Sequence, residues 1–353
     1  MSDADSTDTT DFDEQDAPTP VGVKLGSTRT VLDLPDERGE RERHSTLTCL
    51  ATYEDAITGE EKALYGHDAA VEYPDSVRFM LRSGLPENDD GVADAEAFFE
   101  AVVDAHDVPA DSAVVYAVPT IDNEAGVENL EAVIEGSSVG EAAVRSFPES
   151  LCGAIPAYGD GLDAIDEVFV SVNMGSTTLE ACAYRRGEQL SPFSTGSVTG
   201  NEVDRWIVAA VEEESQGRVH IDRTTAREYK EEHADVYDFE PFTDVVQQPG
   251  GGSHEFTVDR GVRDPVDRYV DDAVDVVANE FLPELANDHM KPYQLALGRP
   301  IAVTGGMACI PGLVEEFEKR LSAELDRDVE VVAPDDPATA AAEGAARIAE
   351  RLV

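Results

Sequence analysis

Three short glycine turns carry the residues of this chain that are best suited to bind an anion. They are LGSTR (25–29), MGSTT (174–178) and TGGMACIPG (304–312), and each follows an apolar run typical of a β-strand. Glycine lets backbone N–H groups approach a ligand, and serine and threonine add hydroxyl donors. The third turn opens into a helical pattern, whose N-terminus favours negative charge. Any one turn is explained by the needs of a hairpin, but the three together predict a polyphosphate site.

Other familiar binding signatures are absent from the sequence. The chain has no G-x-x-x-x-G-K-[ST] segment and no G-x-G-x-x-G after a strand. The histidines form no H-x-H or H-E-x-x-H motif, and the cysteines form no C-x-x-C pair, so we expect no zinc site. The cysteines stand among apolar or small residues, which predicts buried free thiols. They are Cys49, Cys152, Cys182 and Cys309.

The elements around the first two turns repeat each other. Residues 21–34 read as strand, Gly-Ser-Thr turn and strand, and so do residues 167–188. This internal repeat predicts two related halves that face one ligand. Further strands and helices alternate along the chain, which predicts an α/β fold built on mixed sheets. Strands are expected in 45–55, 112–120, 299–304 and 329–333, and helices in 92–105, 124–135, 201–215, 223–235, 264–285, 313–325 and 336–352. A polar stretch at 35–45 and a loop at 247–254 separate some of them.

The charge of the chain argues against several partners. With 26 basic and 75 acidic residues the net charge is −49, so the surface repels nucleic acid and anionic membranes. Hydrophobic residues make up 41%, which is enough for a core. Only five basic residues are lysines. This composition is typical of a protein from a salt-loving cell, where concentrated salt screens self-repulsion, rather than of an acidic protein of ordinary cytoplasm.

The N-terminal segment and the hydropathy predict a cytoplasmic protein. Residues 1–20 contain seven acids and no base, which indicates a disordered acidic tail rather than a membrane-binding amphipathic helix. No apolar run reaches the length of about 18 residues that a transmembrane helix needs. No signal peptide is visible either. We expect no direct membrane insertion, and recruitment through a protein adaptor stays open.

The order of these segments resembles the actin superfamily, in pattern most of all the bacterial rod-shape actin MreB. LGSTRT and SVNMGSTTLEA resemble its two phosphate loops, RTTAREYKEEHA its adenosine-contacting helix, and TGGMACIPGL its adenosine loop. TGNEVDRWI, PESLCGAIPAY and PDDPATAAAEGAA resemble three further segments in the expected order. The resemblance spans residues 21–353. Together with the acidic composition, it points to the haloarchaeal actin homologues of the salactin and volactin type.

The resemblance implies a two-lobed, actin-like (ribonuclease H-like) α/β ATPase fold, with ATP or ADP in the cleft between the lobes. It implies a first lobe in 21–165 with a smaller inserted subdomain at about 35–110, and a second lobe in 166–334 with an insert at about 215–260. Residues 335–353 would form a helix that returns to the first lobe, and residues 1–20 would be the acidic tail.

The same resemblance assigns roles to particular residues. Phosphates would contact Gly26, Ser27 and Thr28 from one lobe, and Gly175, Ser176 and Thr177 from the other. The adenosine would lie between the third turn and the segments before and within residues 223–235. Its candidates are Gly305, Gly306, Met307, Ile310, Gly200, Arg227, Lys230 and Glu231. Glu149 stands where the family has the side chain that orients the attacking water.

These assignments have simpler alternatives in the same sequence. Glu149 is also explained as a surface acid, Lys230 and Glu231 as an exposed helix face, and Ile310 as a core residue.

Two positions depart from the family pattern. Lys24 and Asn173 stand where the family has the aspartates that organise Mg²⁺ and its waters. Because Mg²⁺ is usually held by one or two carboxylates with waters and phosphate oxygens, its binding is in doubt, and no metal ligand is assigned. Lys24 could give positive charge to the phosphates, mark a slow or inactive ATPase that still binds nucleotide, or point to solvent. Glu180 and Asp204 are nearby acids that could compensate for the missing aspartates.

The function implied is that of a cytoskeletal protein that binds ATP and forms filaments. Nucleotide would close the cleft, and head-to-tail contacts between copies would generate an open polymer. Its role would be cell shape or intracellular organisation in a halophilic archaeon. The alternatives are a non-polymerising adaptor or regulatory pseudo-ATPase, and a reactivase-type ATPase. ATP hydrolysis itself is left open by Lys24 and Asn173.

Overall fold

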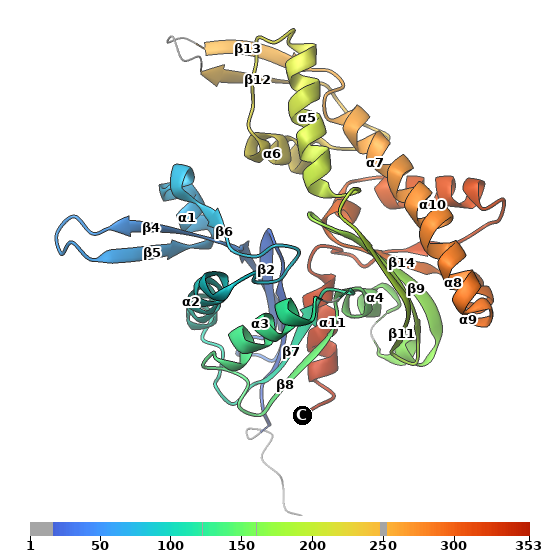
Figure 1. Cartoon of the computed structure of the whole chain (residues 1–353), viewed down its shortest axis with the longest axis horizontal. Coiled ribbons are helices and arrows are strands. Elements are labelled where there is room, and N and C mark those ends of the chain that lie inside the picture. Colours follow the sequence, from blue (N-terminus) through green and yellow to red (C-terminus); the bar gives the residue numbers. More distant parts are fainter. Residues whose placement is uncertain (1–16, 122, 160, 248–252) are drawn as a thin grey trace, which may run out of the picture.

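Two five-stranded mixed sheets form the centre of the molecule (Figure 1). The computed structural model describes residues 17–121, 123–159, 161–247 and 253–353, so most of the predicted tail and of the 247–254 loop lie outside it. The first sheet has the order β3-β2-β1-β7-β8, with strands Arg41–Leu47, Arg29–Pro35, Pro20–Leu25, Ala113–Val118 and Ala143–Pro148. The second has the order β11-β10-β9-β14-β15, with strands Glu188–Thr195, Leu179–Arg185, Val168–Met174, Ile301–Thr304 and Val331–Val332.

The two sheets share one topology. In each sheet the first three strands form an antiparallel meander, and the last two join it in parallel. Each meander contains a predicted hairpin, with Leu25 opposite Thr30 in one and Met174 opposite Leu179 in the other. The internal repeat read from the sequence is therefore confirmed as two related halves, which we call the first and second lobes.

Helices cover both faces of each sheet. The first lobe has α2 (Asp89–Ala105) and α3 (Glu124–Glu135) on one face, where they pack on Val21, Val23 and Leu25 of β1. The second lobe is covered by α5 (Gly200–Glu214), α7 (Arg263–Asp275), a π-helical turn η4 (Val276–Phe281), α8 (Leu282–Asp288) and α10 (Leu313–Glu324). The remaining helices are α1 (Gly66–Glu72), α4 (Glu149–Ala157), α6 (Arg223–His233), α9 (Met290–Ala296) and α11 (Ala340–Ala349), with short 3₁₀ turns at Pro74–Ser76, Asp163–Asp166 and Gly306–Cys309.

Two small sheets extend from the lobes. β4 (Cys49–Glu54), β5 (Glu61–Tyr65) and β6 (Arg78–Phe79) form one, and β12 (Phe242–Gln247) pairs with β13 (Ser253–Val258) in the other. Both lie inside the residue ranges for which inserted subdomains are predicted. The domain boundaries themselves stay a prediction.

Helices α4 and α11 form a layer between the two sheets. α11 packs on the first sheet through Val115 and Ala117, and α4 packs on the second through Phe169 and Tyr184. The two helices approach closely because their contact is glycine- and alanine-rich. A Cβ on Gly344 would lie 1.9 Å from the carbonyl oxygen of Cys152.

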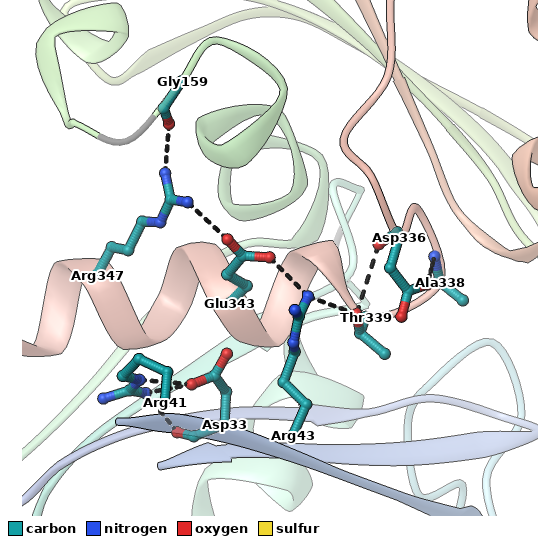
Figure 2. Close-up of polar contacts among 9 residues, drawn as sticks. All are labelled: Asp33, Arg41, Arg43, Gly159, Asp336, Ala338, Thr339, Glu343 and Arg347. Carbon is teal, nitrogen blue, oxygen red and sulfur yellow. Dashed lines mark hydrogen bonds and ion pairs between the residues drawn. The ribbon is translucent and has the colours of Figure 1, made fainter. Parts of the chain in front are cut away.

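Ion pairs fix α11 to the edge of the first sheet (Figure 2). Glu343 binds Arg43 of β3 at 2.9 Å and Arg347 of its own helix at 2.6 Å. Arg347 also donates to the carbonyl oxygen of Gly159, beyond the end of α4. The C-terminal helix is thus attached to the first sheet.

Several elements differ from the sequence-based expectation. The long helix expected at 264–285 is confirmed as one continuous helical run over 263–288. Its α-helical pattern changes to a π-helical turn after Asp275, because Pro283 lacks the amide that would continue the α-helical ladder. β3 begins at Arg41, inside the polar stretch at 35–45, since an edge strand carries exposed polar side chains. β1 begins at Pro20, one residue inside the predicted tail.

Within the parts of the chain that the structure describes, no helix is both long and apolar enough to cross a membrane.

Candidate functional site

The three glycine turns meet around one cavity of about 340 Å³, which is lined from both lobes. The turn after β1 enters it from the first lobe, and the turns after β9 and β14 enter it from the second. Every predicted site residue except Gly305 lines this cavity. These residues are Lys24, Gly26, Ser27, Thr28, Glu149, Asn173, Gly175, Ser176, Thr177, Gly200, Arg227, Lys230, Glu231, Gly306, Met307 and Ile310.

The two Gly-Ser-Thr turns have the same local geometry. The amide of Gly26 donates to the carbonyl of Arg29 at 3.0 Å, and the amide of Gly175 donates to that of Thr178 at 2.9 Å. A Cβ on either glycine would lie within 2.8 Å of the accepting oxygen, so both positions require glycine. The tightness of each turn follows from this close approach.

The hydroxyl groups of the two turns touch across the cleft. Thr28 Oγ1 donates to Ser176 Oγ at 3.0 Å, and Ser27 Oγ lies 3.3 Å from Thr177 Oγ1. Ser27 Oγ also accepts the amide of Gly84 at 2.7 Å. The cleft thus presents two facing sets of hydroxyls, which can turn to an anion placed between them.

Gly305 lies behind the second turn instead of facing the cavity. Its φ is +91°, and a Cβ would come within 2.5 Å of the carbonyl oxygen of Met174. Its expected contact with a ligand is therefore not supported by its position. Gly305 instead sets the path of the third turn, which brings Gly306, Met307 and Ile310 to the cavity wall.

The floor of the cavity holds an ion pair. Lys24 Nζ, near the end of β1, lies 2.6 Å from Glu149 Oε1, at the first residue of α4. Asn173 Nδ2 of β9 donates to the same oxygen at 3.0 Å. The Lys24 side chain is only 15% exposed, so the alternative in which Lys24 points to solvent is wrong. Glu149 is likewise only 16% exposed and is no ordinary surface acid.

A second carboxyl group lies buried beside this pair. Glu180 of β10 is 3% exposed, and its Oε2 accepts the amide of Thr120 at 3.0 Å. Burial, followed by repulsion from Glu149, raises the pKa of Glu180 to about 7. The sequence marks Glu180 only as a nearby acid, and it gives no signal that Thr120 would be its partner.

The adenosine side of the predicted site is organised by a buried ion pair between α5 and α6. Lys230 Nζ lies 2.5 Å from Asp204 Oδ1 and donates to the carbonyl of Gly200 at 3.0 Å. Burial raises the pKa of Asp204, while Lys230 opposes that shift. The alternative of an exposed helix face is wrong for Lys230, which is 8% exposed. Its ammonium thus contacts one oxygen of the Asp204 carboxylate and a backbone carbonyl.

Arg29 and Glu231 bridge the cleft at its rim. Arg29 Nη2 donates to Glu231 Oε2 at 3.0 Å, and Arg227 Nε lies 4.0 Å from the other oxygen of Glu231. Ile310 and Met307 belong both to the second-lobe core and to the cavity wall. The prediction of four buried thiols is wrong for Cys309, which is exposed and lines the cavity.

The fold and the position of this cavity define a class of protein. Two related lobes around a central cleft form the two-lobed actin-like fold. MreB 5 of Spiroplasma citri bound to AMPPNP matches it with a TM-score of 0.74 at 17% identity, over 93% of this chain and 95% of that chain. The MamK double helical filament matches with a TM-score of 0.74 at 19% identity, over 95% and 99%.

The chain belongs to the Salactin family, whose family model matches residues 18–353. Salactin of Halobacterium salinarum is 62% identical over 349 residues, which cover 99% of this chain and 96% of that protein. The resemblance to the actin superfamily and to its haloarchaeal members is thereby confirmed.

Proposed function

We propose that this protein binds ATP or ADP in the cleft and assembles into nucleotide-dependent cytoskeletal filaments. The observation that carries the proposal is the pair of Gly-Ser-Thr turns that face each other across the cleft, with hydroxyls 3.0 and 3.3 Å apart. Two facing cradles of this kind suit a chain of phosphates that touches both lobes. Solved structures with this fold, the MreB 5 of Spiroplasma citri, are bound to AMPPNP and to ADP.

In this proposal, the phosphates and the adenosine contact different parts of the cavity lining. The two Gly-Ser-Thr turns contact the phosphates, and the third turn and α6 enclose the adenosine through Gly306, Ile310 and Arg227. Lys230 acts as a positioning residue, because its ion pair with Asp204 holds α6 against α5. In this proposal Glu149 orients the attacking water after it leaves its bonds to Lys24 and Asn173.

Assembly follows from the coupling of the lobes to the nucleotide. A ligand held by both lobes fixes the angle between them, and head-to-tail contacts between copies of fixed shape propagate into an open filament. A solved filament with this fold, that of MamK, is double helical. We place the polymer in the cytoplasm of a halophilic archaeon, in cell shape or intracellular organisation.

A second candidate function is a non-polymerising adaptor or regulatory pseudo-ATPase of the same fold. The Lys24–Glu149 pair favours it, because a carboxylate held at 2.6 Å by an ammonium is not free to act on water. Nucleotide would then stabilise the fold without release of phosphate.

Sedimentation of the full chain in molar KCl, with ATP, ADP or no nucleotide, distinguishes these functions. We expect the protein to pellet in the presence of ATP, and Thr177→Val to weaken this response, because the variant removes a hydroxyl of the second turn. Thr224→Val, on the exposed face of α6 outside the cavity lining, is the matched control. Folded protein that binds ATP but stays in the supernatant at every concentration would favour the adaptor.

A further inference from the structure

Each acid of the cavity already has a partner. Glu149 is bound by an ammonium and an amide, and Glu180 is buried against a backbone N–H. Asp204 and Glu231 each pair with a cation. The partners are Lys24 and Asn173 for Glu149, Thr120 for Glu180, Lys230 for Asp204, and Arg29 for Glu231.

These residues do not fit a protein-held magnesium ion. Mg²⁺ is usually bound through one or two carboxylates, with waters and phosphate oxygens completing its octahedron. At the floor of this cavity, Glu180 is buried against a backbone amide, and an ammonium lies 2.6 Å from Glu149. A dication placed there would meet that positive charge at short range. Among the described residues, no group of three or more His, Cys, Asp or Glu side chains is arranged to hold a metal ion.

Lys24 is placed to do what such an ion would do for the phosphates. A Cβ on Gly26 would lie 3.4 Å from Lys24 Cε, so the lysine stem runs along the first Gly-Ser-Thr turn. The ammonium has three N–H donors, and its contact with Glu149 leaves others for a phosphate oxygen. The other lysine of the cavity, Lys230, is committed to Asp204 and to the carbonyl of Gly200.

We propose that Lys24 is the cation that this cleft offers to the terminal phosphates, so that nucleotide binds without a divalent ion held by the protein. The inference rests on the proposed function, because it concerns the same cleft. A compact, strongly hydrated ammonium suits a phosphate as a point charge. Glu149 keeps the ammonium at the cavity floor when no phosphate is present.

Calorimetric titration of the full chain with ATP and with ADP in molar KCl tests this directly. One series contains excess EDTA and the other contains MgCl₂. We expect the two dissociation constants to agree within about threefold, because no protein carboxylate has to bind the ion. Binding that is weakened more than about tenfold by EDTA overturns the inference and leaves the proposed function intact. No binding in either series would instead contradict the proposed function.

Substitutions of Lys24 provide a second test of the same inference, by the same calorimetric titration. Lys24→Met keeps the length of the side chain without its charge, and we expect binding in EDTA to weaken about tenfold or more. Lys24→Asp places a second acid beside Glu149, so Mg²⁺ should restore much of the affinity lost in EDTA. Lys291→Met on α9, outside the cavity lining, is the matched control and should bind as the unmodified chain does.

The double variant Lys24→Met/Glu149→Gln guards against misfolding, because it leaves no unpaired carboxylate at the cavity floor. We expect it, too, to lose affinity in EDTA. If folded Lys24→Met or the folded double variant binds ATP in EDTA as tightly as the unmodified chain, the role assigned to Lys24 is wrong.

Discussion

At the scale of single residues, the cleft is governed by where charges are buried. Lys24, Glu149 and Glu180 line the cavity together with the two Gly-Ser-Thr turns, and the more buried of the two acids, Glu180, is the one with the raised pKa. A ligand that brings phosphate to Lys24 would change the electrostatic environment of both carboxyl groups. Under the proposed function, the protonation of Glu180 and the binding of nucleotide are therefore linked.

The free energy of unfolding should depend on pH because the buried Glu180 has a raised pKa. Its pKa of about 7 in the folded chain lies above the ordinary value of 4.5, so the folded state holds the proton more tightly. This contribution to stability is fully present below the ordinary pKa and is lost as the pH rises through the folded pKa. Between about pH 4.5 and 7, we expect the free energy of unfolding of the unmodified chain to fall by up to about 3 kcal/mol relative to that of Glu180→Gln.

Thermal or denaturant unfolding of both proteins at about pH 5 and about pH 8 measures this difference. Glutamine cannot ionise, yet it can still accept the Thr120 amide, so the titration of groups remote from Glu180 cancels in the comparison. Parallel pH profiles of the two proteins would show that Glu180 does not titrate in this range.

At the scale of elements, two close contacts set the geometry of the site. One is the contact between α4 and α11, and the other is the Lys230–Asp204 pair that fixes α6 on α5. Both lie behind the residues that face the ligand. Substitutions there are expected to act first on the free energy of unfolding.

Loss of the Lys230 charge should destabilise the second lobe. Lys230→Met leaves Asp204, which is 4% exposed, as a buried carboxylate without its cation. We expect a cost of about 3 kcal/mol in the free energy of unfolding. Adding Asp204→Asn should recover much of it, as a double-mutant cycle would measure. Lys319→Met removes the lysine from an ion pair in which Lys319 is 69% exposed, and should cost less than about 1 kcal/mol. Equal costs at Lys230 and Lys319 would contradict the burial argument.

The contact between α4 and α11 should tolerate no side chain at Gly344. Gly344→Ala places a methyl group 1.9 Å from the Cys152 carbonyl oxygen, and relief requires movement of backbone. We expect a loss of about 3 kcal/mol or more in the free energy of unfolding, or failure to fold. Gly306→Ala is the matched control, because no atom lies within 4 Å of its Cβ position. Similar stability of the two variants would show that α4 and α11 are not held this closely.

The elements that were predictable from sequence are those with a clear period or turn signal. Both Gly-Ser-Thr hairpins and α3 are confirmed, and α3 has the predicted bounds. Helix α4 was missed because it is buried on nearly all sides, so its sequence has no polar face to reveal a helical period. The cavity residues were found through the turns and the resemblance. The pairing of Lys24 with Glu149 joins positions 125 apart in the chain (149 − 24), and local sequence does not encode such a contact.

At the scale of the whole molecule, charge and shape act together. Two lobes that share a topology enclose the cleft, and a chain of net charge −49 must hold them together against its own repulsion. In molar salt the Debye length is about 3 Å, which is much shorter than the molecule, so repulsion between separated surface charges is screened. Acidity is therefore expected to affect stability without specifying the fold.

Stability should fall as salt is withdrawn. We expect the unfolding midpoint, followed by circular dichroism, to decrease steadily from molar KCl to low-salt buffer, because repulsion between carboxylates is no longer screened. Sucrose at equal osmolality is the control, since it stabilises compact states without screening charge. A midpoint that is independent of KCl would contradict this interpretation of the composition.

The most direct test of the central claim is calorimetric titration of ATP, in molar KCl with MgCl₂, against a variant that fills the cleft. Gly306 lines the cavity and faces open space, so Gly306→Phe should occupy the adenosine wall without disturbing the fold. Gly161→Phe places the same side chain outside the cavity lining, at a position with no atom nearer than 3.8 Å. We expect one ATP per chain for the unmodified protein and for Gly161→Phe, and binding weakened by about tenfold or more for Gly306→Phe. Equal affinity in all three proteins would contradict a nucleotide site between the lobes.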